Sequence, residues 1–158
     1  MKCRHCATEL TLPFLDLGSA PPSNAYLTEA SINAPEVWYP LRLLVCQHCW
    51  LVQTEDHAGR EALFTDDYAY FSSFSSSWLA HAKSYVQAMQ ARFALGASSQ
   101  VVEIASNDGY LLQYVQAAGI PCYGVEPTAS TAAAARAKGI AVVDRFFGVA
   151  LADELAAA

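Results

Sequence analysis

Short apolar runs alternate with helical patterns in the last third of the chain. The short β-branched run at residues 100–104 predicts a buried parallel strand, and residues 121–125 and 140–143 predict a second and a third strand. The segments that follow them have helical periodicity, and we expect helices over residues 110–118, 128–138 and 151–158. This β-α-β-α-β order is the first half of a Rossmann-like, doubly wound sheet, so the predicted fold class is α/β.

A single amphipathic helix is predicted upstream of this sheet. A serine at position 75, 76 or 77 can cap its N-terminus. Apolar side chains then recur at helical spacing, at Trp78, Leu79, Ala82, Tyr85, Val86, Met89 and Phe93. We expect this stripe to pack into the core of the protein.

The first 60 residues follow a different pattern. They contain short β-like runs such as residues 41–45, five of the seven prolines and four of the five cysteines. We therefore expect a small β-rich domain over residues 1–60, a connecting loop and helix over 61–97, and the Rossmann-like domain over 98–158. Three strands are fewer than a sheet of the usual size needs, so we expect this last domain to be truncated.

Composition and charge narrow the class of protein. The 158 residues carry 9 basic and 15 acidic side chains, for a net charge of −6, and 54% are hydrophobic. Without a basic stripe, nucleic-acid binding is not expected. No apolar run approaches the roughly 20 residues of a membrane span, and no secretory signal is visible, so we expect a cytoplasmic protein. The oligomeric state stays open.

Two matching C-x-x-C pairs predict a metal site. In the cytoplasm such cysteines are expected as metal ligands or plain thiols rather than disulfides. Two C-x-x-C loops can complete a tetrahedron of thiolates around Zn²⁺, and four protein ligands make a closed, structural site. His5 and His48 lie inside the two loops and are alternative ligands. The predicted ligands are Cys3, Cys6, Cys46 and Cys49.

Nucleotide-binding turns that follow a first strand have the general pattern acidic-x-Gly-x-Gly-x-Gly, and the turn after residues 100–104 departs from it. Ala105 and Asn107 replace the first two glycines, and only Gly109 is kept. Glu103 and Asp108 would repel the phosphates of a dinucleotide, whereas S-adenosylmethionine has no phosphate and carries a sulfonium cation. The acidic turn therefore favours S-adenosylmethionine.

A further acid, Glu126, ends the second predicted strand. An acid about 20 residues after the first strand is placed to accept hydrogen bonds from both ribose hydroxyls. We expect the cofactor to be bound by Glu103, Ala105, Asn107, Asp108, Gly109 and Glu126.

Four motifs together resemble the sugar C-methyltransferases of deoxysugar pathways, a class I methyltransferase family with an N-terminal zinc-binding domain. The cysteine pairs match that domain, and residues 101–112 (VVEIASNDGYLL) match the cofactor turn. The ribose-binding strand end is matched by residues 124–127 (GVEP). The family's connecting segment is similar to residues 68–73 (YAYFSS) and 77–82 (SWLAHA).

The resemblance implies a reaction on a nucleotide-linked keto-deoxysugar. A base removes the proton beside the carbonyl, and the enolate carbon attacks the sulfonium methyl in line. It also implies that Tyr68 and Tyr70 lie beside the active site. The family's base is a histidine beyond this sequence, so we expect the 158-residue chain to be an N-terminal portion that is inactive alone.

Two other hypotheses remain open at this stage. One is a zinc-ribbon binding module fused to a non-catalytic Rossmann-like domain. The other is a methyltransferase whose acceptor is not a sugar.

Overall fold

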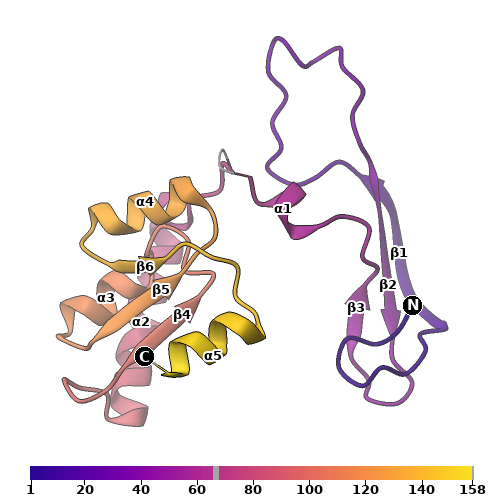
Figure 1. Cartoon of the computed structure of the whole chain (residues 1–158). Coiled ribbons are helices and arrows are strands. Elements are labelled where there is room, and N and C mark those ends of the chain that lie inside the picture. Colours follow the sequence, from indigo (N-terminus) through magenta and orange to yellow (C-terminus); the bar gives the residue numbers. More distant parts are fainter. Residues whose placement is uncertain (66–67, 158) are drawn as a thin grey trace. The chain divides into compact units, whose positions relative to one another are not determined.

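A computed structural model describes residues 1–65 and 68–157 of the chain, in two compact units. The first unit comprises Met1–Leu63 and the second comprises Phe64–Ala158. Figure 1 shows an antiparallel sheet in the first unit and a mixed arrangement of strands and helices in the second. The predicted α/β fold class, with a small β-rich zinc-type unit, is confirmed.

The first unit is built on a three-stranded antiparallel sheet in the order β1-β2-β3. The strands are β1 (Leu12–Ala20), β2 (Tyr39–Val45) and β3 (Val52–Thr54), and a short helix, α1 (Arg60–Leu63), follows. The apolar run that predicted a strand at residues 41–45 forms most of β2. The pairing of β1 with β2 is irregular at two places, one of them between Asp16 and Ser19, where Gly18 has a φ of 78°.

The apolar core of the first unit is very small. Its buried members are Cys3, Leu10, Leu44 and Cys46, so half of them are cysteines. Large apolar side chains elsewhere in the unit are exposed, including Phe14, Leu17 and Tyr26. A unit of this size with so little buried apolar surface needs another source of stability, such as a bound metal.

The second unit contains a three-stranded parallel sheet in the order β4-β5-β6. The strands are β4 (Val101–Ile104), β5 (Cys122–Val125) and β6 (Ala141–Val143), each within a residue of its predicted bounds. The helices α3 (Leu112–Ala117), α4 (Ala129–Ala137) and α5 (Val149–Ala157) follow the three strands in turn. Figure 1 shows α3 and α4 beside the sheet, as the β-α-β-α-β pattern predicts.

The core of the second unit packs α3 and α4 against the sheet. Its buried residues are Val86, Leu112, Val115, Ile120, Ala135 and Ile140. The expectation that the first parallel strand is buried was wrong for one of its faces, because Val102 and Ile104 are 42% and 51% exposed. Side chains alternate along a strand, so only the face that bears Val101 and Glu103 is covered.

Before the sheet come a 3₁₀ turn, η1 (Ser72–Phe74), and the long helix α2 (Ser76–Phe93). Ser75 caps α2, since its side chain accepts a hydrogen bond from the Trp78 N–H at 3.2 Å. The predicted core stripe is confirmed only in part, since Leu79 and Met89 are half-buried. Ala82 and Val86 are buried, but exposed fractions of 42% to 60% are found for Trp78, Tyr85 and Phe93.

Candidate metal centre and cofactor turn

The two C-x-x-C loops have the same backbone structure. The N–H four residues after the first cysteine bonds back to that cysteine's carbonyl, from Ala7 to Cys3 at 3.0 Å and from Trp50 to Cys46 at 2.9 Å. Ala7 and Trp50 both have left-handed backbone angles, with φ of 60° and 64°. Each loop therefore turns its two sulfurs toward the same side.

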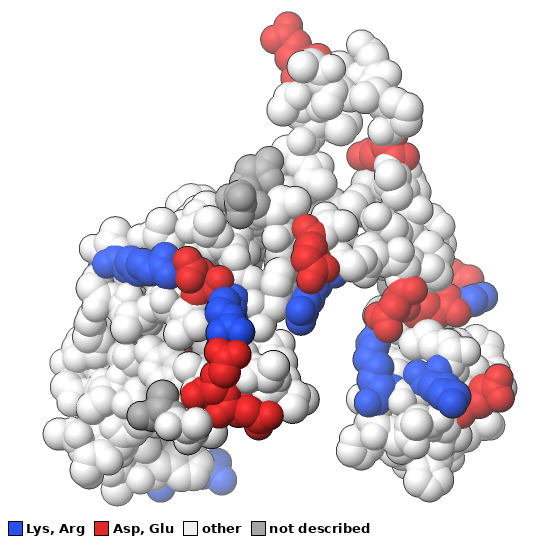
Figure 2. All heavy atoms as spheres, in the orientation of Figure 1, with Lys and Arg blue, Asp and Glu red and all other residues white. Residues whose placement is uncertain are grey.

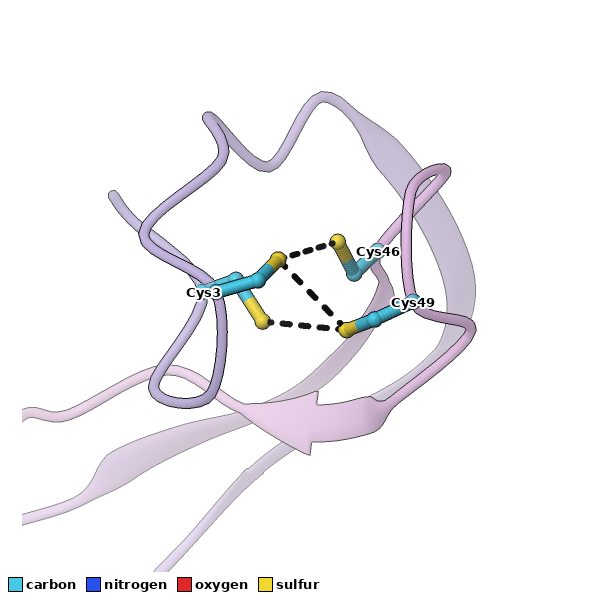
Figure 3. A group of neighbouring side chains, drawn as sticks. Cys3, Cys46 and Cys49 are labelled. Carbon is cyan, nitrogen blue, oxygen red and sulfur yellow. Dashed lines mark hydrogen bonds between the residues drawn. The ribbon is translucent and has the colours of Figure 1, made fainter.

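These loops bring four sulfurs into one cluster. The Sγ atoms of Cys3, Cys6, Cys46 and Cys49 all lie within 4.8 Å of one another. Figure 3 shows the side chains of Cys3, Cys46 and Cys49 converging, and the shortest sulfur separation is 3.5 Å, between Cys6 and Cys46. Disulfides have sulfurs about 2.05 Å apart, whereas a tetrahedron with Zn–S bonds near 2.3 Å separates its sulfurs by about 3.8 Å.

The electrostatics of the cluster also fit a cation. Hydrogen bonding to Thr8 lowers the pKa of the Cys6 thiol to about 5, so this sulfur is readily ionised. The Leu51 N–H acts in the same direction on Cys49, but burial and the neighbouring cysteines overcome it and raise the pKa of Cys49 to about 12. Four thiolates cannot share this space without a positive charge between them, and Zn²⁺ supplies that charge.

Gln53 is a second contributor that the sequence pattern did not reveal. Its side chain is only 4% exposed and donates a hydrogen bond from Nε2 to the Cys3 sulfur at 3.3 Å. Its other atom, Oε1, accepts the Arg4 N–H at 3.0 Å. Such partners orient metal ligands. Within the described residues, the clustered donors are the four cysteines, and neither His5 nor His48 belongs to the group.

The turn after β4 keeps the shape of a glycine-rich loop although two glycines are replaced. Ala105, Asn107 and Gly109 have φ of 59°, 50° and 75°, so all three positions of the G-x-G-x-G pattern are left-handed. This conformation is free of penalty for glycine, tolerable for asparagine and costs about 1–2 kcal/mol for alanine. The backbone shape is therefore preserved with side chains added to it.

Two glycines allow close packing around this turn. A Cβ on Gly109 would overlap Ile140 Cδ1, and a Cβ on Gly124 would overlap the Ser106 side chain. Gly124 lies on β5, so the turn packs directly on the neighbouring strand. Sequence reasoning had placed Gly124 in a motif without giving it this role.

Glu126 directly follows β5, is buried, and accepts a hydrogen bond from the backbone of the turn. It is 5% exposed, and its Oε2 accepts the Asn107 N–H at 2.9 Å. Its Oε1 accepts the Thr128 N–H at 3.0 Å. An ionised carboxylate offers about four lone-pair sites, so each oxygen retains capacity for a further donor. Ribose binding by Glu126 remains a prediction.

Glu103 lies on the covered face of β4, close to two other acids. Burial is the main cause that raises the pKa of its carboxyl to about 7, and the charges of Asp108 and Glu126 act in the same direction. A hydrogen bond from the Tyr110 hydroxyl opposes the rise. The turn thus concentrates negative charge at the carboxyl ends of β4 and β5.

Asn107 and Asp108 turn their side chains toward the segment before α2. Asn107 Oδ1 accepts the Ser72 N–H at 2.9 Å, and its Nδ2 donates to the Tyr70 carbonyl at 3.0 Å. Asp108 Oδ2 accepts the Ser73 N–H at 3.3 Å. Cofactor contact by these two side chains stays a prediction. In the structure, both side chains also form hydrogen bonds that hold the segment before α2 to the turn.

The two tyrosines predicted near the active site differ in their surroundings. Tyr68 packs against Phe64, with ring centroids 5.4 Å apart, and its carbonyl lies 3.5 Å from Ser130 Oγ. Tyr70 is 49% exposed, and its backbone is held to the turn by Asn107. The side chain of Tyr70 is therefore available beside the turn, and that of Tyr68 has an aromatic neighbour.

Several buried polar atoms around the turn have no partner among the described residues. They are Glu103 Oε2, Asp108 Oδ1, Ser106 Oγ and Thr128 Oγ1. Leaving such an atom unsatisfied costs about 1–3 kcal/mol, so their grouping at one turn indicates a ligand that supplies hydrogen-bond donors or positive charge. S-adenosylmethionine carries ammonium, sulfonium and hydroxyl groups and therefore fits these residues.

Charged side chains of both signs are spread over the face drawn in Figure 2. On that face, most of the lysine and arginine side chains lie beside acidic ones, and they form no continuous basic area. Among residues 1–65 and 68–157, no helix is long and apolar enough to cross a membrane.

Comparison with known proteins agrees with the metal site in the first unit. Residues 3–64 match a family described as a putative zinc binding domain, which includes all four clustered cysteines. The chain is 28% identical over 155 residues to the C-methyltransferase NovU of Streptomyces niveus. That match covers 98% of this chain and 37% of the relative, so the chain spans little more than a third of the relative's length. These matches agree with the resemblance read from the motifs: the chain is similar to a zinc-binding family over residues 3–64 and to part of a C-methyltransferase over nearly its whole length.

Proposed function

We infer that this chain is the zinc-carrying, cofactor-binding part of a C-methyltransferase that uses S-adenosylmethionine. The observation that carries this proposal is the group of unpartnered buried acceptors at the β4 turn, which includes Glu103 Oε2 and Asp108 Oδ1. Similarity to a C-methyltransferase along nearly the whole chain supports the same reaction class.

The turn suits a cation better than a phosphate. Glu103, Asp108 and Glu126 are close enough for their charges to act on one another. Lys138 offsets part of this charge, because its Nζ lies 3.4 Å from Asp108 Oδ2. The remaining negative charge favours a sulfonium or ammonium ligand and opposes the pyrophosphate of a dinucleotide.

Each of these residues has a task in holding the cofactor. The Glu126 carboxylate fixes the turn through the Asn107 N–H and has lone pairs left for ribose hydroxyls. The Glu103 and Asp108 carboxylates provide acceptors for positively charged groups. When bound, the cofactor supplies an electrophilic methyl group. The chain's own contribution is to hold and orient the cofactor that carries this group.

The acceptor that we propose is a nucleotide-linked keto-deoxysugar, as the family resemblance implies. Tyr70 is exposed beside the turn and is therefore the tyrosine better placed to contact it. The zinc site is assigned a structural role, because four protein thiolates leave no position for water or substrate.

Calorimetric titration of the zinc-loaded chain with S-adenosylmethionine tests the proposal. We expect one site per chain, and we expect Glu126→Ala to weaken binding by about 1.5–3 kcal/mol, the range for a hydrogen bond to a charged group. A folded chain that binds no S-adenosylmethionine would overturn the cofactor assignment. Binding without methyl transfer to any keto-sugar nucleotide by the full-length protein would instead overturn the acceptor.

A further inference from the structure

The segment Tyr70–Ser73 is tied to the cofactor turn by side chains rather than by sheet or helix pairing. The Asn107 amide bonds to both sides of Phe71, accepting from Ser72 N–H and donating to the Tyr70 carbonyl. Because the amide offers one acceptor and two donors, it can fix both backbone groups at once. Thirty-five or more residues separate the partners along the chain, so this contact is purely tertiary.

A second contact is made by Lys138, which lies just after α4. Its Nζ donates to the Ser73 hydroxyl at 2.8 Å and to the Asp108 carbonyl at 2.7 Å. The ammonium therefore bridges the segment and the turn, and it is 32% exposed, which keeps the bridge partly shielded from water. Ser72, at the centre of the segment, is only 6% exposed.

The Asp108 carboxylate connects this arrangement to the ligand site. Its Oδ2 accepts the Ser73 N–H, while its Oδ1 is buried and has no partner among the described residues. A donor that reaches Oδ1 would fix the orientation of the whole carboxylate and, with it, the bond to Ser73. Aromatic contact extends the link, since Tyr110 of the turn stacks on Trp78 of α2 with centroids 6.0 Å apart.

We propose that Asn107 and Lys138 are positioning residues that hold Tyr70–Ser73 against the cofactor turn, so that ligand binding at the turn and the placement of Tyr70 are linked. The link to ligand binding rests on the proposed function, because that function identifies the ligand. The attachment of Tyr70–Ser73 to the turn does not depend on it. Coupling of this kind is reciprocal: a ligand that stiffens the turn protects the segment, and loss of the attachment weakens the ligand.

The test compares Asn107→Gly with Ala105→Gly. Both changes place glycine at a left-handed position of the same turn, so both preserve the backbone shape. Only Asn107→Gly removes the side chain that holds the segment, because Ala105 is exposed and carries no polar group. Amide hydrogen exchange of Ser72 and Ser73 in the whole chain is the readout. We expect exchange at Ser72 to rise about tenfold in Asn107→Gly and to stay near wild type in Ala105→Gly.

Lys138→Met provides a second variant, matched by Lys83→Met on the exposed side of α2. The first change is expected to raise exchange at Ser73 several-fold and the second to leave it unchanged. If the amide exchange rates were the same in Asn107→Gly as in Ala105→Gly, and the same in Lys138→Met as in Lys83→Met, the proposed attachment would be overturned.

Saturating S-adenosylmethionine then tests the linkage. It should slow exchange at Ser72 and Ser73 several-fold in the wild type and in Lys83→Met but not in Asn107→Gly. Binding to the wild type without any change in exchange would refute the linkage. If the wild type does not bind S-adenosylmethionine, the proposed function is refuted. The attachment of the segment is then tested by the exchange rates of the variant pairs without ligand.

Discussion

Replacing Glu103 with glutamine should stabilise the second unit at neutral and alkaline pH. Glutamine has the same shape and can still accept the hydrogen bond from Tyr110, but it carries no charge. In the wild type, burial raises the pKa of Glu103 from 4.5 to about 7. A pKa that is raised on folding favours the protonated form, so the unfolding free energy is highest below pH 4.5 and falls as the pH rises to about 7.

The size of this effect follows from the two pKa values. At 1.36 kcal/mol for each pH unit between them, ionisation of Glu103 costs the folded state at most about 3 kcal/mol. Glu103→Gln is therefore expected to match the wild type near pH 4.5 and to exceed its unfolding free energy by up to about 3 kcal/mol at pH 8.

Urea unfolding followed by helical circular dichroism is the assay, since α2, α4 and α5, the longest helices among the described residues, lie in the second unit. Asp153→Asn removes an exposed carboxylate from α5 and controls for the loss of one negative charge. A gain that is independent of pH, or a loss at pH 8, would refute the reasoning.

Three further results are expected. Gly124→Ala should lower the unfolding free energy by about 1–3 kcal/mol, because its Cβ would overlap Ser106, whereas Gly96→Ala, with open space around the new methyl, should stay within about 0.5 kcal/mol in the same urea assay. Cys46→Ser should abolish the one zinc per chain that elemental analysis is expected to find and unfold the first unit while the helical signal persists; a folded, metal-free first unit would contradict the structural role. Affinity for S-adenosylmethionine should rise between pH 6 and 8, because a bound cation favours ionised Glu103, and calorimetry should show that Glu103→Gln flattens this rise.

Local patterns predicted the parts of the fold that depend on neighbouring residues. The short strand-like runs located β4, β5 and β6, the serines located the cap of α2, and the cysteine spacing located the metal cluster. In each case the information lies within a few residues of the feature, or in a repeated spacing.

Contacts between distant segments could not be read in the same way. Gln53 reaches Cys3 across fifty residues, and Lys138 reaches Asp108 across thirty, so no local periodicity reveals either pair. The prediction that the whole apolar stripe of α2 packs into the core failed in part for a related reason. Helical spacing shows which residues share a face, but not how much of that face another element covers, and Trp78 and Tyr85 remain exposed.

The acidic turn also shows that a backbone conformation can be kept when the residues of its sequence pattern are replaced. Ala105 and Asn107 break the glycine pattern, yet both adopt the left-handed angles that the pattern requires. The sequence therefore located the turn, but only the structure shows that the Asn107 side chain is used to hold Tyr70 and Ser72.

The measurement that most directly tests the account is a parallel calorimetric titration of the zinc-loaded chain with S-adenosylmethionine and with NADH. The three carboxylates around the β4 turn and the unpartnered acceptors beside them predict one site for S-adenosylmethionine and no binding of NADH. Binding of NADH, or of neither ligand by a folded chain, would contradict the central claim that this turn is built for a cationic, phosphate-free cofactor.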